Sequence, residues 1–398
     1  MGRSGSADLP LHGGRVPEWL ASRMARLGEV MVEALVLAEG PHGVLRRLAH
    51  PFWFQALGCV MGMDWHSSGI TTSVLGALKR GLARREDLGL TVCGGRGKHS
   101  RKTPDELKAF GERTGHDGNA LARTSRLVAK VDSALVQDGF SLYLHGFIVA
   151  RDGAWTVVQQ GMNETAKQAR RYHWLSEGVK SFVEEPHAAI EGAPGGRILN
   201  LTDRRAARSR DALQDLAKEP ERVLHELPRL QMPGHHDVRR SDVFIRRLHA
   251  TLHAAKENGP RDFPELLLQP GVGARTVEAL AAVAEVLHGA PSRFADPARF
   301  SLAHGGKDGH PFPVPLKVYD QTISVLKQAV SAAKLGRSEK LDAIARLDTQ
   351  ARILEGTVKG PALEEYLETE RAASHRYGGM TADGPAQPMP KQRQLSLL

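Results

Sequence analysis

The stretch FSLYLHGFIVARDGAWTVVQQGM (140–162) decides the fold, because it is typical of two β-strands joined by a tight turn. Apolar and aromatic residues fill both halves, and the Arg-Asp-Gly sequence between them is a strong hairpin signal. Alternate side chains of a strand face opposite sides, so we expect Tyr143 and His145 to share one face. By the same alternation, Gln159 and Gln160 end the second strand on opposite faces.

The residues that flank this hairpin form the densest polar group in the chain. The segment RTSRLVAKVDSALVQDG (123–139) has helical spacing, and ARRYHWLSEGVKSFVEEPH (169–187) is predicted to be a basic and aromatic helix. Together with the hairpin they predict the surface of one site, where acidic, basic and amide side chains point toward the same place. Aromatic rings there would stack on an unpaired base. The candidate catalytic residues are Lys130, Asp132, Asp138, His145, Gln160, Asn163 and His173.

The composition bounds the class of protein. A length of 398 residues with 41% hydrophobic content is enough for two or three globular domains, and a net charge of +9 favours an anionic partner such as nucleic acid. Cys59 and Cys93 stand far apart with no CxxC, so the sequence indicates neither a disulfide framework nor a thiolate zinc cluster. There is no signal-peptide core and no run of the roughly 18 apolar residues that span a membrane. We therefore expect a cytoplasmic, nucleoid-associated protein without a membrane partner.

Three regions differ in their sequence patterns, and the predicted fold class is α+β. Residues 1–225 mix helical patterns with strand-like runs, which predicts a mixed catalytic domain with a short β-hairpin or sheet. Residues 226–360 are almost entirely helical in period and predict an all-α DNA-binding domain. Residues 361–398 predict a helix, a linker and a flexible tail.

The second region contains DFPELLLQPGVGARTVEALAAVAEVL (262–287), which resembles a helix-hairpin-helix. Two glycines in its turn allow close backbone approach, so amides at the start of the second helix can face a DNA phosphate. A valine between them plugs the gap between the helices, and the arginine and threonine that follow add contacts to the same phosphate. These DNA-binding residues are Gly271, Val272, Gly273, Arg275 and Thr276. The alternative is a helical hairpin that binds nothing.

Further basic residues are predicted to contact DNA. The segment VCGGRGKHSRKTPDEL (92–107) places a glycine-rich loop after a short strand and before a helix that starts at Thr103-Pro104. Glycines let the backbone approach a phosphate and the cations neutralise it. The alternative is a solvated basic turn. The predicted DNA contacts are Arg96, Lys98, Arg101 and Lys102 in this loop, with Arg170 and Arg171 in the segment after the hairpin.

The last five residues, QLSLL (394–398), resemble the short bacterial peptide that binds the DNA polymerase sliding clamp. That resemblance implies that Gln394 supplies hydrogen bonds and that Leu395, Leu397 and Leu398 are buried anchors. A flexible tether raises the local concentration of the protein near DNA without new folded contacts. The alternative is an exposed apolar tail without a partner.

The predicted chemistry has several alternatives. A metal-dependent endonuclease, which we favour, needs carboxylates and histidines around Mg²⁺ or Mn²⁺, and its candidate ligands are Asp64, His66, Glu184 and His187. A DNA glycosylase needs a carboxylate with amide and aromatic groups around a flipped base, for which Asp138, Gln160, Asn163, Tyr143 and His173 are available. In helix-hairpin-helix glycosylases a hairpin lysine or a downstream aspartate acts on the sugar, whereas Ala274 and Pro315 stand at those positions here. This disfavours such a glycosylase unless Asp308 or Asp320 takes the role of the aspartate. The remaining alternatives are a non-catalytic clamp-tethered adaptor and an RNA-processing enzyme.

Long stretches of the chain resemble an uncharacterised bacterial and archaeal family classed as a domain of unknown function. The resemblance covers about residues 7–350 and implies no activity. It rests on the stretches ADLPLHGGRVPEWL (7–20), FWFQALGCVMGMDWHSSGITT (52–72), KVDSALVQDGF (130–140), VVQQGMN (157–163), RRYHWLSE (170–177), FVEEPH (182–187) and AHGGKDGHPFPV (303–314).

Overall fold

A computed structural model of the protein describes residues 9–10, 18–63, 68–166, 168–192, 198–226, 242–298, 324–331, 342–345, 372, 380–381 and 384–385. Residues Met1–Val358 form one compact unit and Lys359–Leu398 form a second. In the second unit β9 (Met380–Thr381) pairs with β10 (Gly384–Pro385). The clamp-like peptide 394–398 lies outside the described residues.

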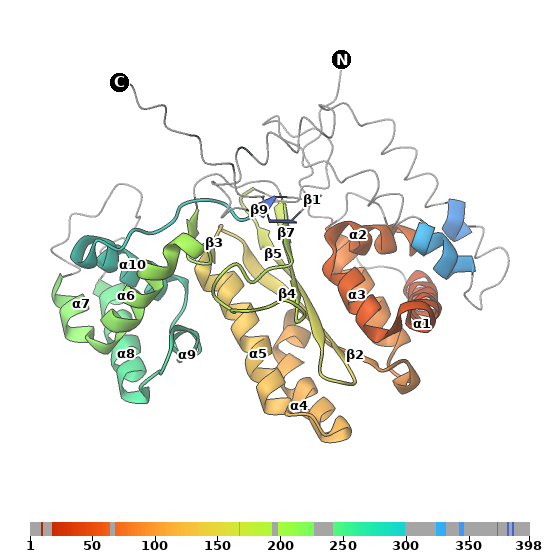
Figure 1. The fold of residues 1–398 in the computed structure, drawn as a ribbon, viewed down its shortest axis with the longest axis horizontal. Helices are drawn as coiled ribbons and strands as arrows, with labels where there is room; N and C mark the ends of the chain where they lie inside the picture. The colour runs from red at the N-terminus through yellow and green to blue at the C-terminus, as the bar shows by residue number, and fades with distance from the viewer. Residues whose placement is uncertain are drawn as a thin grey trace, which may run out of the picture. The chain divides into compact units, whose positions relative to one another are not determined.

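An antiparallel sheet stands at the centre of the first unit (Figure 1). The predicted hairpin is confirmed, because β4 (Ser141–Ala150) pairs with β5 (Trp155–Asn163) across a tight turn. The glycine-rich segment begins as β2 (Leu90–Arg96), which pairs with β4. On the other side of β5 lies β6 (Gln168–Leu175), whose outer edge carries β1 (Leu9–Pro10) and β7 (Ala189–Glu191). The protein is thus a mixed α+β structure with a small sheet, as predicted.

The helix predicted for residues 169–187 is wrong, because its first part is strand β6. Successive side chains of this strand point to opposite faces of the sheet, so neighbouring residues enter different hydrophobic clusters. Trp174 packs in the same cluster as Phe147 and Val157, whereas His173 packs edge-on against Phe54 on the other side of the sheet. A helix would place these side chains on overlapping faces and could not fill both clusters.

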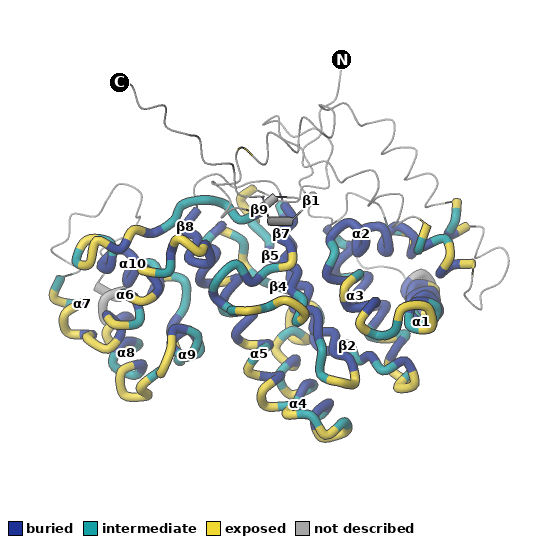
Figure 2. Tube along the Cα trace, in the orientation of Figure 1, coloured by how far each residue is buried: buried dark blue, intermediate teal, exposed yellow. Residues whose placement is uncertain are grey.

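Helices cover both faces of the sheet (Figure 1). One face packs against α1 (Glu18–Ala49), α2 (Pro51–Val60) and α3 (Gly69–Gly81) through a cluster that includes Leu144, Ile148 and Val158. The opposite face packs against α4 (Thr103–Thr114) and α5 (Gly118–Lys130). The strands between these layers are buried along most of their length (Figure 2).

The second face continues into the helices of the region predicted to bind DNA. These are α6 (Ala207–Lys218), α7 (Pro220–Glu226), α8 (Asp242–Asn258), α9 (Phe263–Leu267) and α10 (Ala274–His288). Their apolar side chains share one hydrophobic cluster with α5 and the sheet. The packing therefore shows no break at residue 225, and the assignment of chemistry to one region and DNA binding to the other stays a prediction.

A β-bulge in β4 changes which side chains share a face. Leu142 and Leu144 pair with adjacent residues of β5, so Tyr143 is an extra residue on its strand. Tyr143 consequently packs with the cluster under α1–α3, whereas His145 faces α5. The expectation that Tyr143 and His145 share one face is therefore wrong. Gln159 and Gln160 do face opposite sides, as predicted.

The helix predicted for residues 123–139 ends earlier than its apolar spacing suggests. After α5 the chain makes one wider π-helical turn, η3 (Val131–Leu135), and then enters the short strand β3 (Val136–Gln137), which pairs with β8 (Leu199–Asn200). A π-turn adds one residue per turn and re-aims the side chains within it. Here it directs Asp132 into the interior beside the sheet.

Short 3₁₀ segments complete the described part: η1 (Glu86–Leu88), η2 (Gly97–Lys102) and η4 (Arg204–Ala206). Within the described residues, no helix has both the length and the apolar character needed to cross a membrane.

Candidate functional site

The predicted polar residues next to α5 form a buried cluster around Asp132. The Asp132 carboxylate accepts hydrogen bonds from Gln159 Nε2 and from Trp174 Nε1, the latter at 3.0 Å. His187 Nε2 lies 2.5 Å from its other oxygen. These partners come from β5, β6 and the segment before β7, so a single carboxylate joins three parts of the chain to η3. Such satisfied buried networks fix a unique packing arrangement.

A second chain of hydrogen bonds continues from Gln159. Its amide oxygen lies 2.7 Å from His145 Nδ1, and His145 Nε2 lies 2.8 Å from the Ser125 hydroxyl of α5. The order serine, histidine, amide and carboxylate resembles a nucleophilic relay in its connectivity. However, Ser125 is only 2% exposed and His145 only 6%. A substrate cannot reach them in this structure, so we assign the chain to holding α5 on the sheet.

Burial also sets the charge state of His145. Removal from water lowers the pKa of this imidazole, against the opposing effects of the Gln159 hydrogen bond and the Asp132 charge. A neutral imidazole donates through one ring nitrogen and accepts through the other, which suits its two partners.

Arg170 and Arg171 follow each other on β6 and point to opposite faces of the sheet. Arg170 binds Asp138 at 2.9 Å and Asp296 at 2.7 Å on the α5 side. Tyr172 donates to the same Asp138 carboxylate at 2.6 Å. Burial raises the pKa of Asp138, and the nearby Arg170 charge opposes that rise. Arg170 was predicted to contact DNA, but its side chain is completely buried and no phosphate can reach it.

Arg171 is equally buried, on the side of α1–α3. Its guanidinium pairs with Glu191 of β7, donates from Nε to His173 Nε2 at 2.9 Å, and lies 4.8 Å from the centre of the Phe54 ring. His173 Nδ1 lies 3.1 Å from the Leu48 carbonyl oxygen. Arg171 is therefore also removed from the predicted DNA contacts, because its charge is satisfied inside the protein.

The structure divides the predicted catalytic residues instead of gathering them. Asp132, Asp138 and His145 lie on the α5 side of the sheet, whereas Gln160 and His173 lie on the other side, with Gln160 Nε2 bonded to the Ser68 carbonyl at 3.2 Å. The two remaining residues are tied elsewhere. Lys130 donates to the Val272 carbonyl, and Asn163 accepts the Ala166 amide at 2.9 Å.

The predicted metal ligands do not form a group in the described part. Asp64 and His66 lie outside the described residues. Glu184 pairs with Arg210 at 2.5 Å, and His187 is held by Asp132. Both described ligands are therefore already engaged by protein groups.

The glycine-rich loop after β2 presents its cations to solvent. Arg96, Lys98, Arg101 and Lys102 are exposed and form no ion pair within the described residues. Inside the loop, Glu106 accepts the Gly94 amide at 2.6 Å while Lys79 donates to the Gly94 carbonyl at 2.8 Å. A Cβ at Gly94 would lie 2.2 Å from the His145 carbonyl oxygen, so glycine is required there. Side chains of α3 and α4 therefore hold the backbone at the base of the loop, while its four cations are exposed.

The hairpin at 270–273 joins α9 to α10. Asp262 caps α9 by accepting the Glu265 amide at 2.8 Å, and Val272 is 1% exposed. Gly271 has a φ of +80°, and a Cβ there would lie 2.6 Å from Thr251 Oγ1. Arg275 is exposed, whereas Thr276 is buried with its hydroxyl 3.4 Å from the Gly271 carbonyl oxygen. The predicted phosphate contact of Thr276 is therefore replaced by an internal one.

Two side chains from the segment after α4 donate hydrogen bonds to backbone carbonyls of this hairpin and of the first turn of α10. Lys130 donates to the Val272 carbonyl and Gln137 donates to the Ala274 carbonyl at 2.9 Å. Burial lowers the pKa of Lys130. No sequence pattern indicated that Lys130 holds the hairpin, because Lys130 and Val272 are 142 positions apart. Sequence reasoning also missed Gln159, Trp174 and Glu191, which complete the buried clusters.

A family model described as "Protein of unknown function (DUF763)" matches residues 5–314. Comparisons with curated proteins and with solved structures found no match.

We expect the stability of the protein to fall below pH 6.5 through its buried imidazoles. Burial, together with repulsion from Arg171, holds the pKa of His173 well below its ordinary value. Below about pH 6.5 this imidazole binds a proton in the unfolded chain but not in the native protein. The free energy of unfolding therefore decreases by up to about 1.4 kcal/mol per pH unit as pH falls. His173→Gln removes this contribution, so between pH 6.5 and 5 the free energy of unfolding should depend less steeply on pH than in the wild type.

Urea unfolding at a series of pH values measures this difference. The matched control is His99→Gln, which removes an imidazole from the surface and not from the interior. Equal slopes for His173→Gln and wild type would show that His173 is not held neutral by its surroundings.

Proposed function

Because the chain belongs to the DUF763 family, whose description assigns no activity, we propose from its own geometry that it binds the sugar-phosphate backbone of DNA without reading sequence. The observation that carries this proposal is the hairpin between α9 and α10. Its glycines lie at the surface, its valine is buried and its carbonyls are held from behind by Lys130 and Gln137. Its amide side therefore remains available for a ligand.

The start of α10 supplies the phosphate-binding groups. Gly273 is its N-terminal cap and no side chain caps the first-turn amides. These amides and the helix dipole attract an anion, and the exposed Arg275 adds a positive charge. A Cβ at Gly273 would meet nothing within 4 Å, so the space in front of the backbone is open. A phosphate can approach the chain closely there.

The loop 96–102 supplies a second set of DNA contacts. Its four exposed cations have no acidic partner within the described residues, so they keep their full attraction for phosphate. Arg96 also lies 5.6 Å from the centre of the Tyr143 ring, which restrains its direction. We assign the loop to backbone contacts because lysine and arginine ends bind phosphate without reading the base.

For the activity we propose a metal-dependent endonuclease that acts on damaged or structured DNA in repair or replication. What supports it is the pair of DNA-binding features together with the stock of carboxylates and imidazoles in the N-terminal half, of which Asp64 and His66 remain candidate ligands for Mg²⁺ or Mn²⁺. The glycosylase alternative has less support, because the sheet separates Asp138 from Gln160 and His173.

We further propose that the terminal peptide QLSLL tethers the protein to the sliding clamp. The proposal rests on the sequence of residues 394–398 alone. A tether of this kind would raise the local concentration of the two DNA-binding features on DNA behind the clamp.

Gly273→Ala should weaken duplex DNA binding about tenfold, because a methyl group would keep the phosphate from the α10 amides. Gly273 has φ −151° and ψ −169°, which alanine adopts freely, so folding should be unaffected. Fluorescence anisotropy with several random-sequence duplexes measures the affinity, and the loss should be equal for all of them.

Gly76→Ala is the matched control, since Gly76 is also exposed with open space around its Cβ but lies on α3. In the same assay, replacing Lys98 and Arg101 together by alanine should reduce the slope of log affinity against log salt by about two. Unchanged affinity of Gly273→Ala would refute the hairpin's role in DNA binding, whatever the loop variant does.

Incubation with labelled uracil-containing, abasic, mismatched, flapped and single-stranded DNAs tests the proposed activity. Strand cleavage that needs Mg²⁺ or Mn²⁺ and that EDTA abolishes is the expected result. Breaks that form only after alkali would instead identify a glycosylase, and intact DNA with normal binding would favour the non-catalytic adaptor.

Deletion of residues 394–398 should abolish binding to the sliding clamp while the affinity for DNA stays unchanged, because the leucines supply the buried anchors. Surface plasmon resonance with immobilised clamp measures this binding. Ser396→Ala is the control, since that position tolerates a small residue in the motif, and it should bind as the wild type does. Clamp binding that survives the deletion would contradict the assignment.

A further inference from the structure

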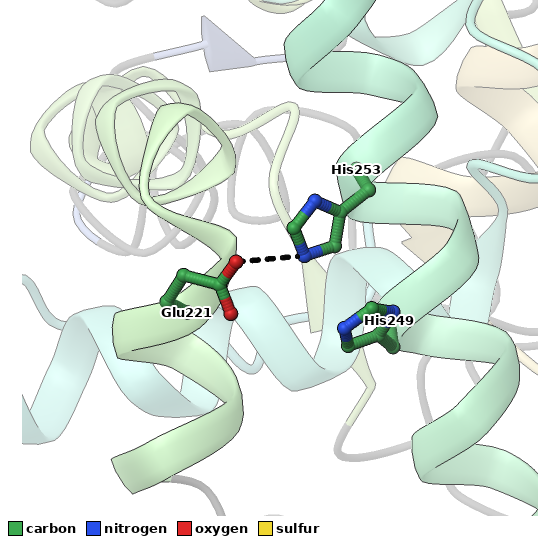
Figure 3. A group of neighbouring side chains, drawn as sticks. All are labelled: Glu221, His249 and His253. Carbon is green, nitrogen blue, oxygen red and sulfur yellow. Dashed lines mark ion pairs between the residues drawn. The ribbon is translucent and has the colours of Figure 1, made fainter.

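Two imidazoles and one carboxylate gather on α7 and α8. His249 and His253 stand four positions apart on α8, and Glu221 lies in the first turn of α7. One ligand atom from each of the three residues lies within 4.8 Å of the others. Figure 3 shows both rings projecting from α8 toward the Glu221 carboxylate. In the described part of the chain this is the one group of at least three such side chains.

The geometry within the group is close to what a metal ion requires. His253 Nε2 lies 3.1 Å from Glu221 Oε1, and the two imidazole rings are 4.2 Å apart between their centres. Ligand atoms around a tetrahedral Zn²⁺ stand about 3.4 Å apart, given metal–ligand distances of about 2.0–2.2 Å. One pair already meets this distance. The exposed His249 and Glu221 can rotate into place for the rest.

The residue types point to a transition metal. Histidines four apart share one face of a helix, which is the spacing found where helices bind zinc. Imidazole nitrogens suit Zn²⁺, Ni²⁺ or Cu²⁺, whereas Mg²⁺ and Ca²⁺ prefer oxygen ligands. We propose that Glu221, His249 and His253 form a binding site for a divalent transition metal of the Zn²⁺ class.

Such an ion would fasten α7 to α8 and would keep at least one coordination position open, because the protein offers three ligands. The site also bears on the DNA-binding hairpin. Thr251, halfway between the two histidines in sequence, lies on the other side of α8 and meets Gly271 of the hairpin. A metal on one face of α8 would therefore hold the helix against which the hairpin rests on the other.

Metal titration of the full-length protein without an affinity tag tests the site. Calorimetry with Zn²⁺ should show one equivalent that is weakened at least about tenfold in both His249→Ala and His253→Ala, since even loss of an outer-shell partner costs about 10–100-fold. Bound Co²⁺ should give a visible absorption band with imidazole ligands in the wild type only. Excess Mg²⁺ should not displace either ion.

The chain contains 18 histidines, so the comparison between variants decides the outcome. His288→Ala, at the exposed end of α10, is the matched control and should bind as the wild type does. Glu221→Gln keeps the size of the side chain and tests the carboxylate without loss of an imidazole. Circular dichroism establishes that each variant is folded, and Zn²⁺ should raise the melting temperature of the wild type but not of the histidine variants.

Equal Zn²⁺ binding by wild type and the histidine variants, or no binding by the wild type, would overturn the proposal and leave an ordinary histidine–glutamate contact. Displacement of Zn²⁺ by Mg²⁺ would overturn the metal class. The titration contains no DNA, so its result is separate from that of the DNA-binding measurements.

Discussion

Two adjacent arginines on β6 impose the constraint on which the rest of the structure depends. Arg170 and Arg171 are completely buried on opposite faces of the sheet, and a buried guanidinium left unpaired would cost about 3–5 kcal/mol. Each face must therefore supply a carboxylate. Asp138 and Asp296 do so on the α5 side and Glu191 does so on the side of α1–α3. Segments far apart in the sequence are thus fixed to one strand.

The same constraint separates structural polar residues from those available for function. The polar groups around β4, β5 and β6 bind one another inside the protein, with Asp132 as the centre of the largest cluster. The groups that we propose to bind DNA are at the surface instead, in the loop after β2 and in the hairpin between α9 and α10. Lys130 and Gln137 join the two systems, because they flank the buried turn η3 yet donate to the hairpin carbonyls.

Helix α8 stands between two features with different chemistry. On one side Thr251 limits the space at Gly271 of the hairpin, and on the other side two histidines face Glu221 of α7. The proposed metal would hold α7 against the helix that contacts the hairpin. If the hairpin binds DNA as proposed, the metal would support that binding without touching DNA.

The sequence by itself determined the local structure: the β4–β5 hairpin, strand β2, the start of α4 and the α9–α10 turn follow from alternation, helical period and turn residues. Alternation along the strand also determined that the side chains of Gln159 and Gln160 point to opposite faces of the sheet. Only the tertiary structure decided the roles of the polar residues, because these depend on partners that no spacing reveals. The bulge at Tyr143 reversed one expected face, and β6 formed a strand because its alternating side chains fill two separate clusters. Arg170 and Arg171 carry the charge expected of DNA contacts, but buried carboxylates from elsewhere in the chain neutralise them.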